Sequence, residues 1–458
     1  MKLFATKVRP SKTHDMTEGN PFKLIFFYSI PVILGNLFQN FYSMADSIIV
    51  GRLLGTHALA AVGNTGPMTF LILGFISGLT SGFAVITAQA FGSKNQDELK
   101  RSIAMNVILN MAFGLFFTFL ALITNRPLLE MINTPEEIIA DSKLYLDIIY
   151  SGIFATVLYN ATSCILRAVG DSKTPLVFLI FSSILNIILD IILIKYTDLG
   201  VAGAAYATVI AQLISGILSV AYILIRYPEL HVKKEHFAWS TSFASRHLKI
   251  GMPMAFQFSI TAIGVIVLQG ALNKFGPNVI AAFTAANKVE QLIAVAAFSF
   301  GTVMANYTGQ NFGARKLDRI KAGTKAGTIL TLCFSVVSML IAFIFPEQLT
   351  SLFVDSASAG YENVIKYSRE YLFLTAMFYP PLFLIFIFRN VLQSIGKTFM
   401  PLMGGVFELL ARTVCAFTLP LFWGYAGICL AGPAAWLSAA IPLFISYLVI
   451  IKKIEKDF

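Results

Sequence analysis

Apolar runs of about 20 residues recur along the whole sequence, and each could cross the roughly 30 Å hydrocarbon core of a bilayer as a helix. Hydrophobic residues make up 57% of the 458 residues, whereas charged residues make up only 13%. Soluble domains carry about 25% charged residues. The pattern therefore predicts an integral membrane protein and excludes an ordinary soluble enzyme.

Windows of about 19 residues define twelve candidate membrane-spanning segments. The runs are continuously apolar rather than alternating, which favours helices over the strands of a membrane barrel. We therefore expect an all-α integral membrane protein with twelve transmembrane helices. The predicted helices cover residues 22–48, 58–90, 102–124, 140–164, 176–196, 201–225, 249–272, 279–308, 323–345, 364–388, 401–423 and 426–450.

Lysine and arginine gather in alternate connections between these runs, and the net charge is +10. Membrane topology explains this basic charge, so we do not expect a nucleic-acid partner. Short cytoplasmic loops carry such an excess, so we expect both termini and the central linker to be cytoplasmic. The first 20 residues contain no apolar signal segment, so the first span is expected to direct insertion. The basic residues on the predicted cytoplasmic side are Lys2, Lys7, Arg9, Lys12, Lys23, Lys94, Lys100, Arg101, Arg226, Lys233, Lys234, Arg246, Lys249, Arg315, Lys316, Arg319 and Lys321.

The two halves of the chain resemble each other. Residues 89–92 (Gln-Ala-Phe-Gly) match residues 310–313 (Gln-Asn-Phe-Gly) at an offset of 221, and Pro31 and Pro253 open the two copies. Each copy has six spans, and because six is an even number, both copies begin on the same side of the membrane. A pseudo-two-fold axis along the membrane normal would therefore relate two six-helix lobes. The expected parts are an N-terminal tail (1–21), an N-lobe (22–225), a linker (226–248), a C-lobe (249–450) and a C-terminal tail (451–458).

Two acidic residues lie inside predicted spans of the first half, where an ionisable side chain is costly and is a functional candidate. Asp46 shares a helical face with Gln39 and Ser43, and Asp190 follows Asn186 by one turn. The alternative is structural: Asp46 at the water interface, and Asp190 holding helices together by hydrogen bonds. Because the second half has no equivalent acids, we favour a cation or proton site in the first lobe.

Charged residues also lie in predicted spans of the second half. Glu290 either faces a cavity and meets a cationic substrate or forms a hydrogen bond between helices. Glu408 and Arg412 are four residues apart, the spacing of an ion pair within one helix, and we expect that pairing rather than substrate binding. No acid lies in the tenth span around Tyr379.

Proline inside a span removes a backbone donor and bends the helix, so Pro31 is a candidate hinge, although static kinks are equally common. The candidates for the lining of a substrate cavity are Gln39, Ser43, Glu290 and Tyr379.

Motifs for enzyme chemistry and for resident metals are missing from the sequence. We find no GxxxxGK[ST], GxSxG or HExxH motif, and the four cysteines have no metal-binding spacing. His231, His236 and His247 of the linker do not share one helical face. We therefore predict that the protein is not an enzyme, has no cofactor, and draws its energy from an ion gradient.

The chain resembles the multidrug and toxic compound extrusion (MATE) family over nearly its whole length. The resemblance implies two six-helix lobes, alternating access, a bacterial-type inner membrane location, and export of organic cations in exchange for protons or sodium. It is carried by Pro31, residues 45–47 (Ala-Asp-Ser), Gly92 before a charged loop, residues 167–171 (Arg-Ala-Val-Gly-Asp) with residues 173–175 (Lys-Thr-Pro), and residues 309–314 (Gly-Gln-Asn-Phe-Gly-Ala).

Two branches of that family differ in their functional acids. In the DinF-like branch, the functional residues match Asp46, Asn186, Asp190 and Thr208 of this sequence, so the resemblance implies a proton or sodium site there. The NorM-like branch uses carboxylates in spans seven and ten, but Thr261 stands where the first would fall. The resemblance therefore favours the DinF-like branch.

We expect a monomeric multidrug antiporter whose partners are small organic cations and the lipid bilayer, and two alternative functions would require other residues. A flippase for a lipid-linked precursor of the same superfamily would need many basic residues for pyrophosphate, and only Lys288 and Arg412 are candidates. A membrane-embedded enzyme would need clustered histidines or acids near an interface, but the five histidines lie in predicted loops or tails.

Overall fold

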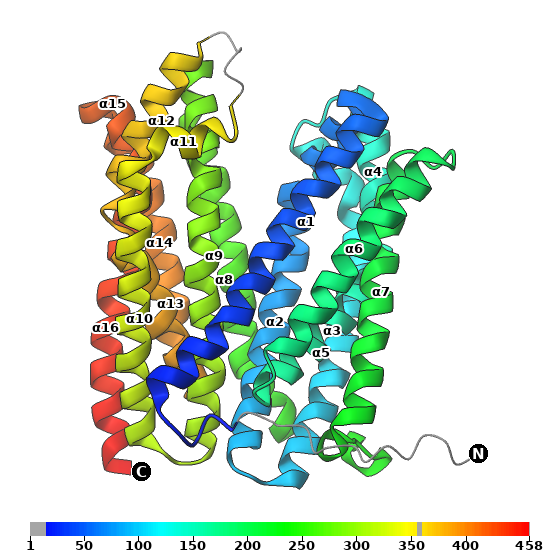
Figure 1. Cartoon of the computed structure of the whole chain (residues 1–458), viewed down its shortest axis with the longest axis vertical. Coiled ribbons are helices and arrows are strands. Elements are labelled where there is room, and N and C mark those ends of the chain that lie inside the picture. Colours follow the sequence, from blue (N-terminus) through cyan, green and yellow to red (C-terminus); the bar gives the residue numbers. More distant parts are fainter. Residues whose placement is uncertain (1–14, 355–359, 458) are drawn as a thin grey trace. The chain divides into compact units, whose positions relative to one another are not determined.

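The computed structural model describes residues 15–354 and 360–457, and Figure 1 shows how its helices follow one another. The described part of the chain contains α-helices, two short 3-10 helices and no strand. The predicted all-α class is therefore confirmed. Four of the basic residues used to predict the orientation of the N-terminus lie outside the described residues: Lys2, Lys7, Arg9 and Lys12.

Helices of the first half correspond to the six predicted spans, with α4 and α5 together matching one of them. Two 3-10 helices in the linker, η1 (Pro228–Leu230) and η2 (Lys234–Phe237), come after them. The helices are α1 (Pro21–Asn64), α2 (Gly66–Gly92), α3 (Gln96–Met131), α4 (Glu136–Ser151), α5 (Ile153–Ala168), α6 (Lys173–Lys195) and α7 (Val201–Arg226).

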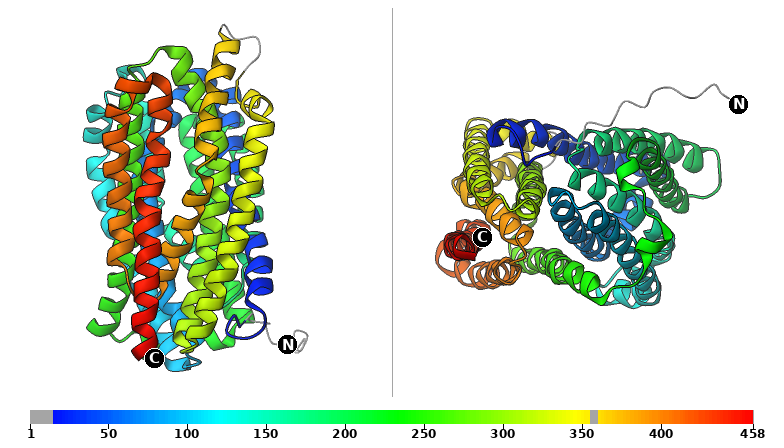
Figure 2. Two further views of the ribbon diagram at one scale, coloured as in Figure 1. Left: turned by 90° about the vertical axis from the view of Figure 1, so that its left-hand side faces the viewer. Right: turned by 90° about the horizontal axis from the view of Figure 1, so that it is seen from below.

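Helices of the second half repeat this order with additional short segments. Within this half, α16 packs along α14 and α13 (Figure 2). The helices are α8 (Thr241–Leu272), α9 (Pro277–Gly313), α10 (Leu317–Ile344), α11 (Pro346–Ser351), α12 (Tyr361–Ala376), α13 (Tyr379–Ser394), α14 (Phe399–Thr418), α15 (Pro420–Cys429) and α16 (Ala431–Asp457).

Ten helices in the described part of the chain are long and apolar enough to cross a membrane, and two bent pairs raise this number to twelve. The pairs are α4 with α5, bent by 47°, and α12 with α13, bent by 49°. The first bend falls at Gly152, where a Cβ atom would overlap the side chain of Val209. The second falls before Pro380 and Pro381, which occupy the first turn of α13, where proline is tolerated. Twelve spans were predicted, and two of them are bent.

Glycines explain where two predicted connections differ from the observed ones. Gly55 has a φ of 87° and separates the first two spans with almost no loop, where we expected a connection of several residues. Gly424, with a φ of 53°, lies in α15, a short helix that covers the predicted connection at residues 424–425 and the adjoining ends of both predicted spans. The last long helix therefore begins at Ala431, five residues later than predicted.

Contacts divide the chain into two compact units. Unit 1 contains Met1–Glu18, Leu37–Ala255 and Gly309–Ala314, and unit 2 contains Gly19–Asn36, Phe256–Thr308 and Arg315–Phe458. Helices α1 and α8 each contribute to both units. The predicted lobe boundaries and the axis between the lobes stay predictions.

Unit 1 has an apolar exterior and small residues in its interior. Leu115 and Phe119 of α3 have exposed fractions of 70% and 69%, as expected for side chains that face lipid tails. Inside, α6 packs closely on α7 because Gly203 has no Cβ, which would lie 3.0 Å from the Leu193 carbonyl oxygen. This packing brings together the two helices that carry Asn186, Asp190 and Thr208.

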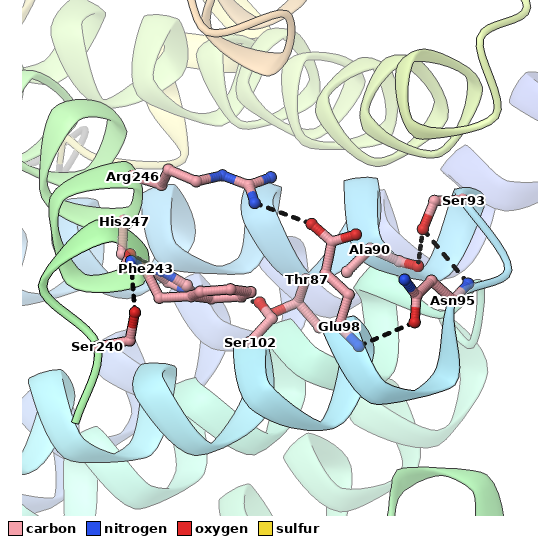
Figure 3. A network of polar contacts seen from close by, with 10 residues as sticks. All are labelled: Thr87, Ala90, Ser93, Asn95, Glu98, Ser102, Ser240, Phe243, Arg246 and His247. Carbon is pink, nitrogen blue, oxygen red and sulfur yellow. Dashed lines mark hydrogen bonds and ion pairs between the residues drawn. The ribbon is translucent and has the colours of Figure 1, made fainter. Parts of the chain in front are cut away.

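The linker packs on α3 within unit 1 (Figure 3). Arg246 donates to Glu98 at 2.8 Å, and the buried His247 ring lies between the Ser102 hydroxyl and the Phe243 carbonyl. His236 is also buried, with its Nδ1 near the backbone of Lys233. The described histidines therefore make separate local contacts.

Candidate functional site

The structure brings together the four residues predicted to form the ion site. Asp46 of α1, Asn186 and Asp190 of α6 and Thr208 of α7 all belong to unit 1. Asp46 has an exposed fraction of 8%, and both Asn186 and Asp190 are fully buried. The burial of Asp46 differs from the interfacial position considered for it above.

The α6 sequence places its acid toward the interior of the unit. Ser182, Ser183, Asn186 and Asp190 follow one another at intervals close to a helical turn, and all four are buried. The opposite face of α6 exposes apolar side chains, including Ile184, Ile188 and Ile191. This amphipathic pattern explains why Asp190 avoids lipid.

The two carboxyl groups are within hydrogen-bonding reach of each other. A hydrogen bond between two carboxyl groups requires a proton on one of them, because carboxylates only accept. The remaining oxygens, Asp46 Oδ1 and Asp190 Oδ1, are buried and have no hydrogen-bond partner within the described residues. The pair can therefore hold a proton and still offers oxygens to a cation.

Asn186 and Thr208 complete the polar group. In one amide orientation, Asn186 Nδ2 donates to Thr208 Oγ1 at 3.3 Å. In the reversed orientation, Nδ2 donates to Asp190 Oδ2 at 2.9 Å and Oδ1 accepts from the Thr208 backbone N–H at 3.1 Å. We adopt the reversed orientation, because it satisfies both atoms of the amide and ties α6 to α7.

Two tyrosines adjoin this group and were missing from the prediction. Tyr42 donates from its hydroxyl to Thr208 Oγ1 at 3.5 Å. Tyr145 of α4 is buried and interacts electrostatically with Asp46. Tyr42 lies one turn before Asp46, so its helical position could have indicated it. Tyr145 follows no such spacing, because it comes from another helix.

The residues predicted to line a substrate cavity are divided between the units. Gln39 and Ser43 are exposed on α1 in unit 1, where the Ser43 hydroxyl donates to the Gln39 carbonyl. Glu290 and the buried Tyr379 belong to unit 2. Their common cavity and the hinge role of Pro31, which is buried within α1, stay predictions.

Glu290 makes the hydrogen bond between helices that was one of its two predicted roles. The Tyr371 hydroxyl of α12 donates to Glu290 Oε2 at 2.9 Å. Arg412 of α14 interacts electrostatically with the same carboxylate.

The predicted pairing of Glu408 with Arg412 is wrong. Glu408 instead forms an ion pair with Arg389 of α13. Arg412 packs against α8, where its Nη1 would lie 2.7 Å from a Cβ atom at Gly264. The neighbouring helix supplies a closer partner for Glu408 than its own helix does, and helical spacing alone cannot show such a partner.

The carboxyl pair is not accompanied by a cluster of metal-binding side chains within the described residues. Residues 15–354 and 360–457 contain no group of three or more histidine, cysteine or acidic side chains that could hold a metal ion. A sodium ion at the pair would therefore depend on amide and hydroxyl oxygens beside the two carboxylates, and such oxygens are ligands that hard cations accept.

Comparisons with known proteins agree with the fold. The MatE family model matches residues 31–192 and 253–418, which together cover most of the chain. A crystal structure of MATE in complex with MaL6 superposes with a TM-score of 0.90 at 23% identity, covering 97% of this chain and 100% of that one. The chain is a multi-pass membrane transporter rather than an enzyme. It belongs to the MatE family, so the predicted family is confirmed.

Bacterial relatives are similar along most of the chain. The probable multidrug resistance protein YpnP of Bacillus subtilis is 28% identical over 389 residues, covering 84% of this chain and 85% of that protein. The probable multidrug resistance protein NorM of Thermotoga maritima is 26% identical, covering 82% and 80%. DNA damage-inducible protein F of Escherichia coli is 27% identical, covering 72% and 73%. Relatives of both branches match, so the DinF-like assignment stays a prediction.

Proposed function

We propose that the protein is a secondary active multidrug exporter that moves organic cations out of the cell in exchange for protons or sodium ions. Relatives named as multidrug resistance proteins support the multidrug class. The coupling is our inference from the buried carboxyl pair of unit 1. We expect the transporter to act as a monomer without a cofactor.

The closeness of the buried Asp46 and Asp190 carboxyl groups is the observation that carries this proposal. Without a proton or cation between them, two buried carboxylates would repel each other at short range. An ion bound there removes that repulsion and stabilises the approach of α1 to α6. Binding can shift a conformational equilibrium only through different affinity in the two states, and a pair that closes around its ion supplies that difference.

Charge distribution favours cations over anionic lipid precursors. The Asp46 and Asp190 carboxyl groups of unit 1 lie beside each other, Asp190 accepts from the Asn186 amide, and neither forms an ion pair with an arginine within the described residues. In unit 2, Arg389 is paired with Glu408, and Arg412 lies beside Glu290. An arginine that is already paired, as Arg389 is, is a poor binding group for a pyrophosphate, so we prefer export of cations to the flippase alternative.

Export from proteoliposomes tests the proposal. We expect Asp190→Asn to lower gradient-driven export of a fluorescent cation by about tenfold or more, the scale of a coupling free energy between sites. Asp46→Asn should have the same effect. Asp198→Asn is the matched control, because Asp198 is an exposed acid directly after α6.

Separate proton and sodium gradients identify the coupling ion. Stimulation by either gradient in the wild-type protein, lost in Asp190→Asn but kept in Asp198→Asn, supports antiport. If Asp190→Asn exports at the wild-type rate with the same gradient dependence, the assignment of the carboxyl pair is wrong. Movement of a labelled lipid pyrophosphate, without export of cations, would instead favour the flippase.

A further inference from the structure

The two copies of the repeated Gln-x-Phe-Gly motif lie against each other within unit 1. They are residues 89–92 at the end of α2 and residues 310–313 at the end of α9. A Cβ atom at Gly92 would overlap the backbone carbonyl of Gln310, and one at Gly313 would overlap that of Gln89. Only glycine allows two helix ends to approach this closely. We call this contact the glycine crossing.

The segment before α1 is bonded to the α9 side of the glycine crossing. Met16 and Thr17 each have an exposed fraction of 1%. The Met16 N–H donates to Gln310 Oε1 at 2.8 Å, and Asn311 Nδ2 donates to the Met16 carbonyl at 3.1 Å. Gln310 Nε2 also donates to the Ala168 carbonyl at 2.8 Å, so its amide is used at both ends.

The same segment is held electrostatically to the α2 side. The Lys94 ammonium, two residues after Gly92, lies 3.6 Å from Asp15 and 3.5 Å from Glu18. Burial raises the pKa of Asp15, but hydrogen bonds with Thr17 and the charge of Lys94 outweigh it and lower the pKa below its usual range. Residues 15–18 therefore bridge the two helix ends that meet at the crossing.

We propose that residues 15–18 are a latch that holds the glycine crossing closed and must release Gln310 before the crossing can open. The inference rests on the proposed alternating access, because the crossing joins helices from the two sequence repeats. Under that mechanism, opening at this end would require the two glycines to separate. The basic connections predict that this end is cytoplasmic, so the latch opposes the inward-open state.

Thiol labelling at Thr17 tests the latch. Thr17→Cys, in a variant without the four native cysteines, should react with a membrane-permeant maleimide about tenfold more slowly than Lys23→Cys, since labelling of a buried site requires local opening. Lys23 is an exposed position at the start of α1. During gradient-driven export the Thr17→Cys rate should rise. Equal rates at the two positions, or a Thr17→Cys rate unaffected by active export, would overturn the latch.

Variants measured without a gradient separate the latch from the proposed antiport. Lys94→Glu should raise the resting Thr17→Cys rate by about threefold, because exposed ion pairs are weak individually and the reversed charge repels both acids. Adding Asp15→Lys and Glu18→Lys should restore protection. Lys452→Glu, at an exposed lysine of α16, is the control. An unchanged rate in Lys94→Glu, or an equal rise in the control, would refute the latch even if export is coupled as proposed.

Substitution of glycines in α2 is an independent test of the latch. Gly92→Ala should expose Thr17→Cys, because the new methyl group cannot fit beside the Gln310 carbonyl. Gly66→Ala, in the same helix α2, has nothing within 4 Å of the new Cβ atom and should leave the rate unchanged. If the folded Gly92→Ala protein keeps position 17 protected, residues 15–18 do not hold the glycine crossing closed. If Gly92→Ala does not fold, the labelling rates of the Lys94→Glu variants test the latch instead.

Discussion

The Asp46 and Asp190 carboxyl groups lie beside each other, whereas the intramembrane Glu408 pairs with an arginine. The first arrangement needs an ion or proton to be stable, and the second is already neutral. Side-chain exposure at the second pair is only 10% for Arg389 and 15% for Glu408. The two pairs should therefore respond in opposite ways when one charge is removed.

We predict that Arg389→Ala destabilises the protein by about 3–5 kcal/mol, because it leaves a buried carboxylate without its partner. Thermal unfolding in detergent, followed by intrinsic fluorescence, measures the change. Arg369→Ala is the control: Arg369 pairs with Glu347 at a site where 66% of its side chain is exposed, and its loss should change stability by less than about 1 kcal/mol.

The double variant Arg389→Met with Glu408→Met should recover most of the lost stability, because replacing both partners of a buried pair by apolar residues is often neutral. If the double variant is less stable than Arg389→Ala alone, Glu408 makes further contacts that the ion pair does not explain.

At the scale of elements, two helices change compact unit close to their prolines. Helix α1 belongs to unit 2 up to Asn36 and to unit 1 from Leu37, five residues or so after Pro31. Helix α8 belongs to unit 1 up to Ala255 and then to unit 2, and it contains Pro253. The first span of each repeat therefore begins in one unit and ends in the other. Each proline therefore lies within about six residues of the point where its helix passes from one unit to the other.

We predict that Pro31→Ala and Pro253→Ala each slow export severalfold without lowering the melting temperature. Alanine restores the backbone donor that proline lacks, which makes the helix straighter and more costly to bend. Pro442→Ala is the matched control, because Pro442 lies inside α16, within a single unit. Export and thermal unfolding are measured on the same preparations. A loss of export in Pro442→Ala equal to that of the other two would indicate a general effect of helix stiffness rather than hinges.

At the scale of the whole molecule, the sequence predicted the features that depend on residues close together in the chain and missed those that depend on contacts between helices. The spans follow from apolar runs, and Asp46, Asn186 and Asp190 stand out as polar residues within such runs. Arg389 was missed because it has no acid at helical spacing, and its partner comes from α14. Contacts between helices depend on packing register, which one sequence does not display. The contact between the repeated glycine motifs was missed for the same reason, although both motifs were recognised.

Membrane orientation is also a property of the whole chain, and its prediction rests on basic residues spread over many loops. Ala238 of the linker is exposed and is predicted to be cytoplasmic, whereas the exposed Asp198 after α6 is predicted to lie outside. In a background without native cysteines, a membrane-impermeant maleimide added to intact cells should label Asp198→Cys and leave Ala238→Cys unmodified until the cells are opened. Each loop of fewer than about 60 residues follows its own lysine and arginine content, so the two sites report on the same rule from opposite sides. If only Ala238→Cys is labelled in intact cells, the predicted topology must be reversed. The latch would then lie at the outer end of the transporter, where it would oppose release rather than uptake of the substrate.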